Sequence, residues 1–250
     1  MILYNVTDGV ASITLNRPEK RNALSGELIE TLSGSLMRSA RDQEVRVVVL
    51  SGAGPDFSSG ADLSELERTA EAGALSHIET ARRLADLFLT MRRHPRPIVA
   101  AVRGRALAGG CGLATACDLI LASESAQFGY TEVKVGFVPA MVMAILRRSV
   151  NEKRAFELIT TGEIVSAAEA EIMGLINHVY TDSDFDARVD AFVAALASKP
   201  SSAVSLAKNL LYHMDGMSFE AAIESGVHAN ALARMTEDAR RGIEKFVKKQ

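Results

Sequence analysis

The first fifty residues alternate between strand-like and helix-like hydrophobic patterns. Residues 10–15 alternate apolar and polar side chains and follow Asp8-Gly9, a pair favoured in tight hairpin turns. From Leu24 to Gln43 the apolar residues recur near helical spacing, and residues 45–50 then form an almost continuous apolar run. The pattern predicts two short N-terminal strands, a helix and a third, buried strand.

The same order continues in the middle of the chain. A helical pattern at 78–91 is ended by Arg96-Pro97, and a strand-like run follows at 98–102. A turn of small residues at 108–112 leads into a helix-compatible segment, and a further buried strand is expected at 118–122. Strands that alternate with helices predict a parallel β/α core with right-handed crossovers.

Beyond Pro139 the strand pattern almost disappears. One short strand is expected at 176–180, a capping box at 166–169, and a helix C-cap at Gly174. Helices are expected at 139–150, 152–160, 166–173, 185–197, 201–214, 219–233 and 237–248. The joint at Lys199-Pro200 divides the chain into a β/α core, residues 1–199, and a C-terminal helical region, residues 200–250.

Composition places the chain among ordinary globular proteins. It has 250 residues, of which 48% are hydrophobic and 24% charged. The net charge of -3 gives no general attraction to nucleic acids or anionic membranes, so neither is expected as a partner. The two cysteines, Cys111 and Cys117, form no disulfide framework, and the N-terminus has no secretory pattern. We therefore expect a cytoplasmic protein.

Two glycine-containing turns follow predicted strands and are candidates for a catalytic site. One is Ala108-Gly109-Gly110-Cys111-Gly112 and the other is the segment 57–63, Phe-Ser-Ser-Gly-Ala-Asp-Leu. Turns of this kind let a ligand approach the backbone, or simply allow tight packing. If both turns converge, two backbone N–H groups form an oxyanion hole, which stabilises charge that develops on a carbonyl oxygen.

At these motifs the sequence resembles the enoyl-CoA hydratase/isomerase, or crotonase, superfamily. The resemblance is carried by residues 15–24 (LNRPEKRNAL), 57–63, 108–112 with Ala116-Cys117-Asp118, 128–132 (FGYTE) with Gly136 and Pro139, and 242–246 (GIEKF). It implies an α/β fold with a ββα spiral core and a C-terminal helical trimerisation region. It also implies an acyl-CoA thioester as substrate, no separate cofactor, and a homotrimer or dimer of trimers.

The resemblance also implies roles for individual residues. The N–H groups of Ala61 and Gly109 would form the oxyanion hole, and Glu132 would be the catalytic acid/base. Taken alone, Glu132 reads as a surface glutamate, Lys20 and Arg21 as solvated charges, and Phe246 as a core anchor. In the family's register Lys20 and Arg21 lie near the adenosine and its phosphates, Phe246 of a neighbouring subunit covers the CoA tail, and Ala140 offers an N–H to a water. The substrate- or CoA-binding residues expected in this way are Lys20, Arg21, Ala23, Ser59, Gly60, Asp62, Leu63, Gly110, Gly112, Ala140 and Phe246.

The reaction itself is less specified than the family. The best-known hydratases carry a second glutamate where this chain has Gly112, three positions past Gly109. Adding water needs two proton transfers that two carboxylates can divide, whereas moving a double bond needs only one carboxylate. Residues 131–140 nevertheless look like the branch of bacterial enoyl-CoA and methylglutaconyl-CoA hydratases. Hydration of an enoyl-CoA is therefore the first interpretation, and Δ3,Δ2-enoyl-CoA isomerisation is the alternative.

Other classes of function have weaker signals in the sequence. The five histidines show no metal-ligand or nucleophile spacing, so no metal is expected. No Gly-x-Gly-x-x-Gly fingerprint opens a helix, which argues against a nicotinamide cofactor. A non-catalytic or RNA-binding member of the fold is a third interpretation. The helix expected at 24–43, however, mixes acidic with basic residues instead of presenting a basic face.

Overall fold

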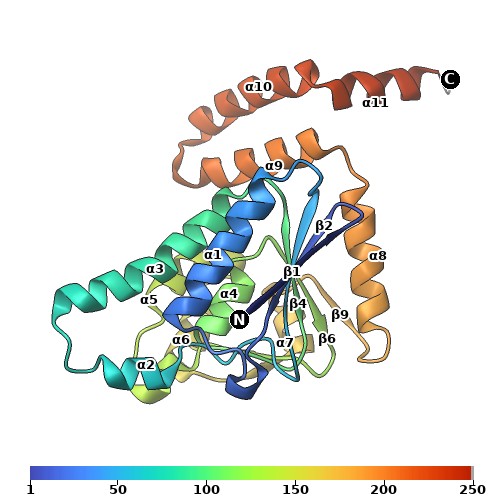
Figure 1. Ribbon diagram of the computed structural model, residues 1–250. Coiled ribbons are helices and arrows are strands. Elements are labelled where there is room, and N and C mark those ends of the chain that lie inside the picture. Colours follow the sequence, from blue (N-terminus) through green and yellow to red (C-terminus); the bar gives the residue numbers. More distant parts are fainter. Residues whose placement is uncertain (249–250) are drawn as a thin grey trace.

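The computed structural model describes residues 1–248, so the last two residues of the expected helical region 200–250 lie outside the description. A twisted sheet is covered by helices on both faces (Figure 1). A helical arm, formed by α10 (Phe219–Met235) and α11 (Glu237–Val247), extends from one end. Strands β1 (Ile2–Thr7) and β2 (Val10–Leu15) form the predicted antiparallel hairpin. Its turn residues Asp8 and Gly9 both have positive φ, 50° and 79°, as a tight hairpin turn requires.

The main sheet has the strand order β1-β2-β3-β4-β6-β9. Its other members are β3 (Val47–Gly52), β4 (Ile98–Val102), β6 (Leu119–Ser123) and β9 (His178–Tyr180). From β2 onward every neighbouring pair is parallel, so the strands end at a common edge. The predicted parallel β/α core is therefore confirmed.

A second, small sheet was not predicted from the sequence and lies under the candidate site. It has the order β5-β7-β8, with β5 (Arg105–Leu107), β7 (Gln127–Gly129) and β8 (Val165–Ser166). These strands have two or three residues each, too few for a hydrophobic period to be visible. Because β5 and β7 pair in parallel, the segments that follow them start side by side.

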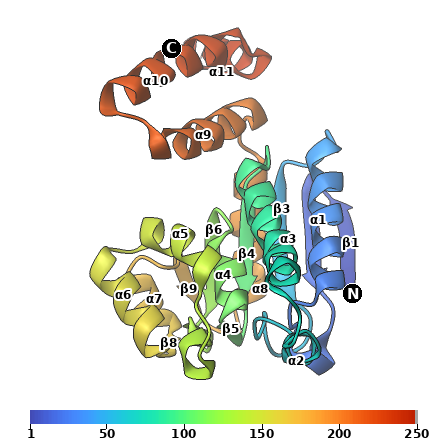
Figure 2. The ribbon, with the colours of Figure 1, turned by 90° about the vertical axis from the view of Figure 1, so that its left-hand side faces the viewer.

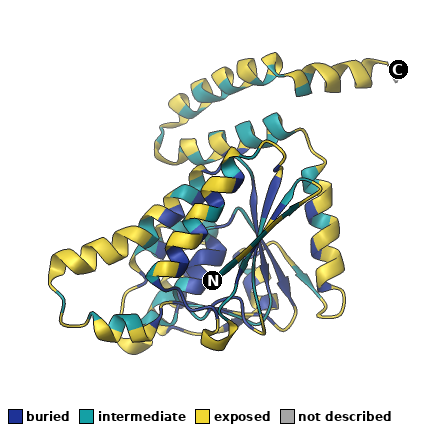
Figure 3. Ribbon diagram, viewed as in Figure 1, coloured by how far each residue is buried: buried dark blue, intermediate teal, exposed yellow. Residues whose placement is uncertain are grey.

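Helices cover the two faces of the main sheet through separate apolar clusters. Helices α1 (Gly26–Arg41), α3 (Ala74–Arg93) and α4 (Gly109–Thr115) pack on one face, where Leu28, Leu87 and Ile98 are fully buried. Helix α8 (Phe185–Ala197) packs on the other face against Val47, Val99 and Leu121. The burial colours of Figure 3 show this layering, with the buried residues on the sheet and on the inner sides of these helices.

The second half of the chain is helical, as predicted. Its helices are α5 (Ala140–Ser149), α6 (Glu152–Thr161), α7 (Ala167–Ile172), α8, α9 (Ser201–His213), α10 (Phe219–Met235) and α11 (Glu237–Val247). Ser166 and Glu169 form the predicted capping box. Helices α10 and α11 lie beyond α9 and away from the sheet, and neither has a buried residue (Figure 2).

Short elements fill the connections. They are α2 (Leu63–Arg68) and the 3-10 turns at Pro18–Lys20, Thr131–Val135 and Met214–Gly216. Within residues 1–248, every helix is too short or too polar to cross a bilayer.

Candidate active site

The structure brings the two predicted turns into contact. Ser58 pairs with β5 in both directions, through Ser58 N to Arg105 O at 3.1 Å and Leu107 N to Ser58 O at 3.0 Å. A Cβ placed on Gly60 would lie 3.1 Å from the nitrogen of Gly109, and one on Gly109 would lie 3.8 Å from the nitrogen of Ala61. The backbones of the two turns therefore run against each other, as an oxyanion hole built from both would need.

Glycine is required where the turns touch. Gly60 has φ +95°, and a Cβ there would lie 2.8 Å from the Cβ of Ala108. At Gly110 a Cβ would lie 2.3 Å from the carbonyl oxygen of Ser58, so this buried glycine serves close packing and has no side chain to offer a substrate. Ala108 has φ 48° and ψ -128°, a strained conformation for a residue with a Cβ, held by its N–H bond to Gly129 O at 2.7 Å.

The amides of Ala61 and Gly109 remain available for a ligand. Around Ala61 the chain pairs with Leu24, which donates to Gly60 O at 2.7 Å and accepts from Asp62 N at 3.3 Å. This leaves the Ala61 N–H directed away from Leu24. Gly109 is the first residue of α4, where an amide has no intrahelical acceptor. Among the hydrogen bonds of residues 1–248, neither amide donates to a protein acceptor.

Glu132 carries a buried carboxyl oxygen beside these turns. It lies in the 3-10 turn that follows β7, and its Oε2 atom has no hydrogen-bond partner within the described part of the chain. Burial raises the pKa of this carboxyl above its ordinary value. Burial also raises the pKa of the Cys111 thiol to about 12, and the nearby Glu132 charge adds to that rise. The carboxyl is thus close enough to the first turn of α4 for its charge to act there.

Tyr130 fixes the segment that carries Glu132. Its ring is fully buried, and its hydroxyl is 2.7 Å from Oγ1 of Thr115 at the end of α4. The C-terminal end of α4 is thereby joined to Tyr130, the residue that directly precedes the 3-10 turn. Tyr130 was predicted only as part of the motif at 128–132, because its hydrogen-bond partner lies 15 positions away in the sequence.

Asp62 holds the turn that carries Ala61. Its carboxylate pairs with Arg17 at 3.0 Å and caps α2 by accepting from Ser64 N at 3.1 Å. Burial alone would raise the pKa of Asp62, but the Arg17 hydrogen bond and charge bring it below its usual value. The side chain is 9% exposed and its oxygens bind groups of its own chain, so it positions the turn. Arg17, which also donates to Ala23 O at 2.8 Å, was not singled out from the sequence.

The loop with Lys20 and Arg21 is attached to the same turn. Ser59 N donates to Arg21 O at 3.0 Å, and both basic side chains are exposed. Asn22 is fully buried and donates to Ala53 O at 2.9 Å and Asp56 O at 2.8 Å, which fixes the loop. The two cations are therefore exposed at the edge of the turn, and their contact with the phosphate end of CoA stays a prediction.

Three other predicted residues are placed differently. Ala23 is buried and its carbonyl oxygen accepts from Arg17, whereas Leu63 is 67% exposed at the start of α2. The Ala140 amide already donates to Val138 O at 2.7 Å, so the prediction that it is open to a water is wrong.

Phe246 lies far from the two turns within its own chain. It is 71% exposed on α11, a helix that packs against α9 and α10. The alternative that it anchors the core of this chain is therefore wrong. Its expected contact with CoA is possible only across a subunit interface.

Gly112 is buried against α5. A Cβ on this residue would lie 2.1 Å from Cγ1 of Val142, a distance at which atoms overlap. The position at which the family resemblance implies a second carboxylate in other members is thus closed in this chain. Val142 was not identified from the sequence, because the contact joins helices 30 residues apart.

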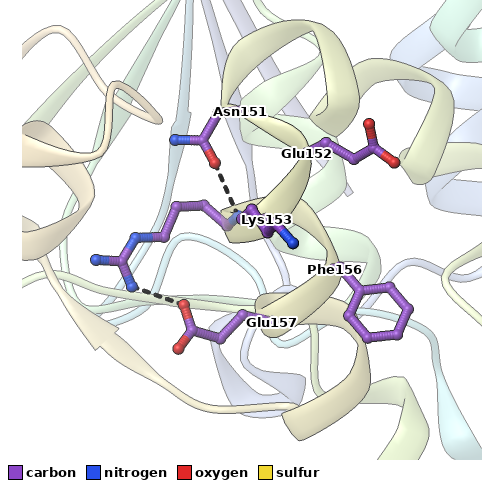
Figure 4. Close-up of a pocket in the computed structure, with 6 residues that line it drawn as sticks. Asn151, Glu152, Lys153, Phe156 and Glu157 are labelled. Atoms are coloured by element: carbon purple, nitrogen blue, oxygen red, sulfur yellow. Dashed lines mark hydrogen bonds and ion pairs between the residues drawn. The ribbon is translucent and has the colours of Figure 1, made fainter.

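Two hollows differ in their relation to the site. One, of about 800 Å³, lies on the outer surface at the start of α6, where Arg154 pairs with Glu157 and the exposed Phe156 points to the other side of the helix (Figure 4). None of its lining residues belongs to the turns described above. The other, of about 640 Å³, lies between α3, α4, α5 and α9. Its lining includes Thr115 at the end of α4 and Phe88, whose ring is 3.7 Å from the Cβ position of Gly112.

Comparisons with known proteins agree with this geometry. The sequence pattern of the family described as Enoyl-CoA hydratase/isomerase matches residues 5–250. A Thermus thermophilus protein with the provisional name enoyl-CoA hydratase is 43% identical over 241 residues, covering 96% of this chain and 95% of that protein. The mitochondrial enoyl-CoA hydratase domain-containing protein 3 of Rattus norvegicus is 34% identical over 243 residues, covering 97% of this chain and 80% of that protein.

The structural comparison gives the same result. The crystal structure of an enoyl-CoA hydratase from Mycobacterium smegmatis superposes with a TM-score of 0.95 at 34% identity, covering 100% of this chain and 96% of that chain. The human enoyl-CoA hydratase domain-containing protein 3 gives a TM-score of 0.94 at 32% identity, covering 100% and 98%. The predicted crotonase-like fold is confirmed.

Proposed function

Since the chain belongs to the enoyl-CoA hydratase/isomerase family, we propose that it acts on an enoyl-CoA thioester and that Glu132 transfers the protons. The observation that carries this proposal is the buried, unpartnered Oε2 atom of Glu132, with a raised pKa, beside two turns with unused amides. A carboxyl whose pKa is raised toward the working pH is suited to both accept and return a proton.

The two turns would supply the electrostatic part of the reaction. With the thioester oxygen between the N–H groups of Ala61 and Gly109, both amides would stabilise the enolate that forms when a proton moves at the neighbouring carbon. Donors fixed in place by the backbone need no reorganisation during the reaction, and losing one typically costs about 10²–10³ in rate. Arg17 and Tyr130 would act indirectly, by holding the turn with Ala61 and the segment with Glu132.

Hydration is the first candidate reaction. It is supported by the names of the relatives from Thermus thermophilus and Mycobacterium smegmatis. In this reaction a water oxygen bonds to C3 of the 2-enoyl group and a proton is added at C2. With Gly112 in place of a second carboxyl, Glu132 would have to serve both transfers.

Isomerisation is the second candidate, and the closed space at Gly112 favours it. Glu132 would take a proton from C2 of a 3-enoyl-CoA, the double bond would move to C2–C3, and the same carboxyl would return the proton to C4. One carboxyl is sufficient for this sequence of steps.

We propose that the acyl and CoA parts of the substrate extend from the site in two directions. The acyl chain would enter the cavity of about 640 Å³ that adjoins Phe88, where apolar side chains such as Leu89 and Ile145 contribute to the lining. The CoA phosphates would meet Lys20 and Arg21. No separate cofactor is proposed, because CoA is part of the substrate.

The proposal is tested with 2-enoyl-CoA and 3-enoyl-CoA in parallel. Hydration removes the absorbance of the conjugated thioester, whereas isomerisation of the 3-enoyl substrate creates it. We expect turnover to fall by about 10²–10⁴ in Glu132→Gln while CoA-ester binding is retained. Wild-type protein that converts neither substrate across a panel of acyl lengths would disprove the proposed function, and an active Glu132→Gln variant would disprove the role of Glu132.

A further inference from the structure

Gly112 and Val142 share one space inside the protein. Gly112 lies three positions after Gly109 on the short helix α4, so both residues are near the same helix face. A Cβ on Gly112 would lie 2.1 Å from Cγ1 and 3.0 Å from Cβ of Val142. Even an alanine side chain is therefore excluded at position 112 while Val142 keeps its place.

Val142 has little freedom to move aside. It is 3% exposed, belongs to the main apolar cluster, and lies in helix α5, where a β-branched side chain strongly prefers one rotamer. Rotation about χ1 would displace Cγ1 but would leave the Cβ at 3.0 Å. The valine methyl group therefore closes the position, and the Val142 Cβ leaves only a tight fit there.

We propose that Val142 is a specificity-determining residue, which keeps a second carboxyl and a bound water out of the position beside Gly112 and so favours proton shuttling over water addition. The inference rests on the function proposed above. A water held beside C3 of the substrate needs polar partners, and the methyl groups of Val142 supply none. With this side closed, Glu132 is the only carboxyl for both transfers, so returning to C4 the proton that it takes from C2 of a 3-enoyl-CoA is favoured over activating a water for addition at C3 of a 2-enoyl-CoA.

The test substitutes both residues at once in the full-length chain. Gly112→Glu with Val142→Gly supplies the carboxyl and the space for it, and Gly112→Gln with Val142→Gly is the matched control of equal shape without an acid/base. We expect the ratio of hydration rate to isomerisation rate, measured from chromatographically separated products, to rise at least about tenfold in the Glu variant relative to the Gln variant. The gain should require the ionised form of the new carboxyl and should therefore alter the pH profile.

Two results would overturn the inference. One is a folded Glu double variant whose ratio of hydration rate to isomerisation rate equals that of the Gln double variant. The other is a Gly112→Glu single variant with the same melting temperature and the same rates as the Glu double variant. A melting-temperature cycle with Gly112→Ala covers the case in which the Glu variant does not fold. Gly112→Ala should lower the melting temperature in the wild-type background and should lower it less in the Val142→Gly background.

Equal losses in the two backgrounds would show that Val142 does not close the position. Because this cycle needs no substrate, its outcome is separate from that of the proposed function, which fails only if the wild type converts neither enoyl-CoA.

Discussion

At the scale of single residues, the burial of the Glu132 carboxyl lowers the stability of the fold near neutral pH and also suits the carboxyl to proton transfer. Its Oε2 atom is buried without a partner, and burial raises the pKa of the carboxyl. A group whose pKa is raised on folding binds its proton more tightly in the folded than in the unfolded state. The contribution of this carboxyl to the free energy of unfolding is therefore fully present at pH values below its ordinary pKa of 4.5. It is lost as the pH rises through the raised pKa of the folded state.

This gives a prediction for the pH dependence of stability. Glu132→Gln removes the ionisation and keeps the shape, so we expect the variant to be more stable than the wild type near neutral pH and equal to it at pH values below the ordinary pKa. Urea unfolding across a pH series measures both free energies of unfolding. The exposed residue Glu220 provides the control, since Glu220→Gln should leave the pH dependence unchanged. If the free energies of unfolding of Glu132→Gln and the wild type differed more at low pH than at neutral pH, the burial argument would be contradicted.

The residues of the site differ in how far a sequence can reveal them. Ala61 and Gly109 lie in glycine-containing turns that come after predicted strands, whereas Glu132 is singled out only through the family resemblance. The Arg17–Asp62 ion pair and the contact of Val142 with position 112 join segments 45 and 30 residues apart. Only the folded chain brings these partners together. The paired Ala140 amide could not be foreseen either, since it depends on the local turn at Val138.

At the scale of elements, one buried ion pair joins α9 to the sheet. The ammonium group of Lys208 on α9 donates to Asp118 Oδ2 at 2.7 Å and to two backbone carbonyls, Met91 O and Arg96 O, each at 3.1 Å. Asp118 also accepts from Tyr212 OH at 2.6 Å and Ile98 N at 2.6 Å. The lysine and aspartate side chains are 7% and 13% exposed, so each buried charge needs the other as its counter-ion.

Breaking this pair should destabilise the protein strongly. Asp118→Ala leaves the Lys208 charge buried without its counter-ion, and we expect a loss of about 3–5 kcal/mol in the free energy of unfolding. Asp190→Ala, at an exposed position of α8, is the control and should change stability by no more than about 0.5 kcal/mol. Chemical denaturation of the two variants makes the comparison. A loss below about 1 kcal/mol for Asp118→Ala would show that water or a shifted helix replaces the aspartate.

The helices and strands of this fold differ in how clearly the sequence predicts them. Helices of ten or more residues, such as α1 and α8, have a visible apolar face, and β3 and β4 are apolar runs bounded by turns. Strands β5, β7 and β8 have two or three residues and are defined by their partners. Helix α2 has no buried residue and therefore no apolar period. These elements carry or flank the site, so its geometry was less predictable than the fold.

At the scale of the whole molecule, the helical arm presents an apolar face that its own chain leaves uncovered. On α10, Phe219, Ile223 and Val227 follow at intervals of four residues and are 76%, 56% and 56% exposed. On α11, Ile243 and Phe246 are 60% and 71% exposed. Exposed apolar residues aligned on one helix face are typical of an interface.

The trimer or dimer of trimers expected from the sequence would cover this face, and its disruption can be tested directly. We predict that the wild type assembles at micromolar concentration, and that Ile223→Asp with Val227→Asp shifts it to smaller species, because two charges would be buried at the interface. Light scattering with size exclusion measures the mass. Ala221→Asp, at an exposed position on the opposite side of α10, is the matched control and should leave the assembly intact.

The same variants connect assembly to the site. If Phe246 of a neighbouring subunit covers the CoA tail, loss of assembly should weaken CoA-ester binding without unfolding the β/α core. Calorimetric titration and circular dichroism on the same samples separate the two effects. A wild-type monomer, or a dissociated variant that binds the CoA ester as tightly as the wild type, would mean that each chain completes its own site. In that case α11 would have no part in binding the substrate.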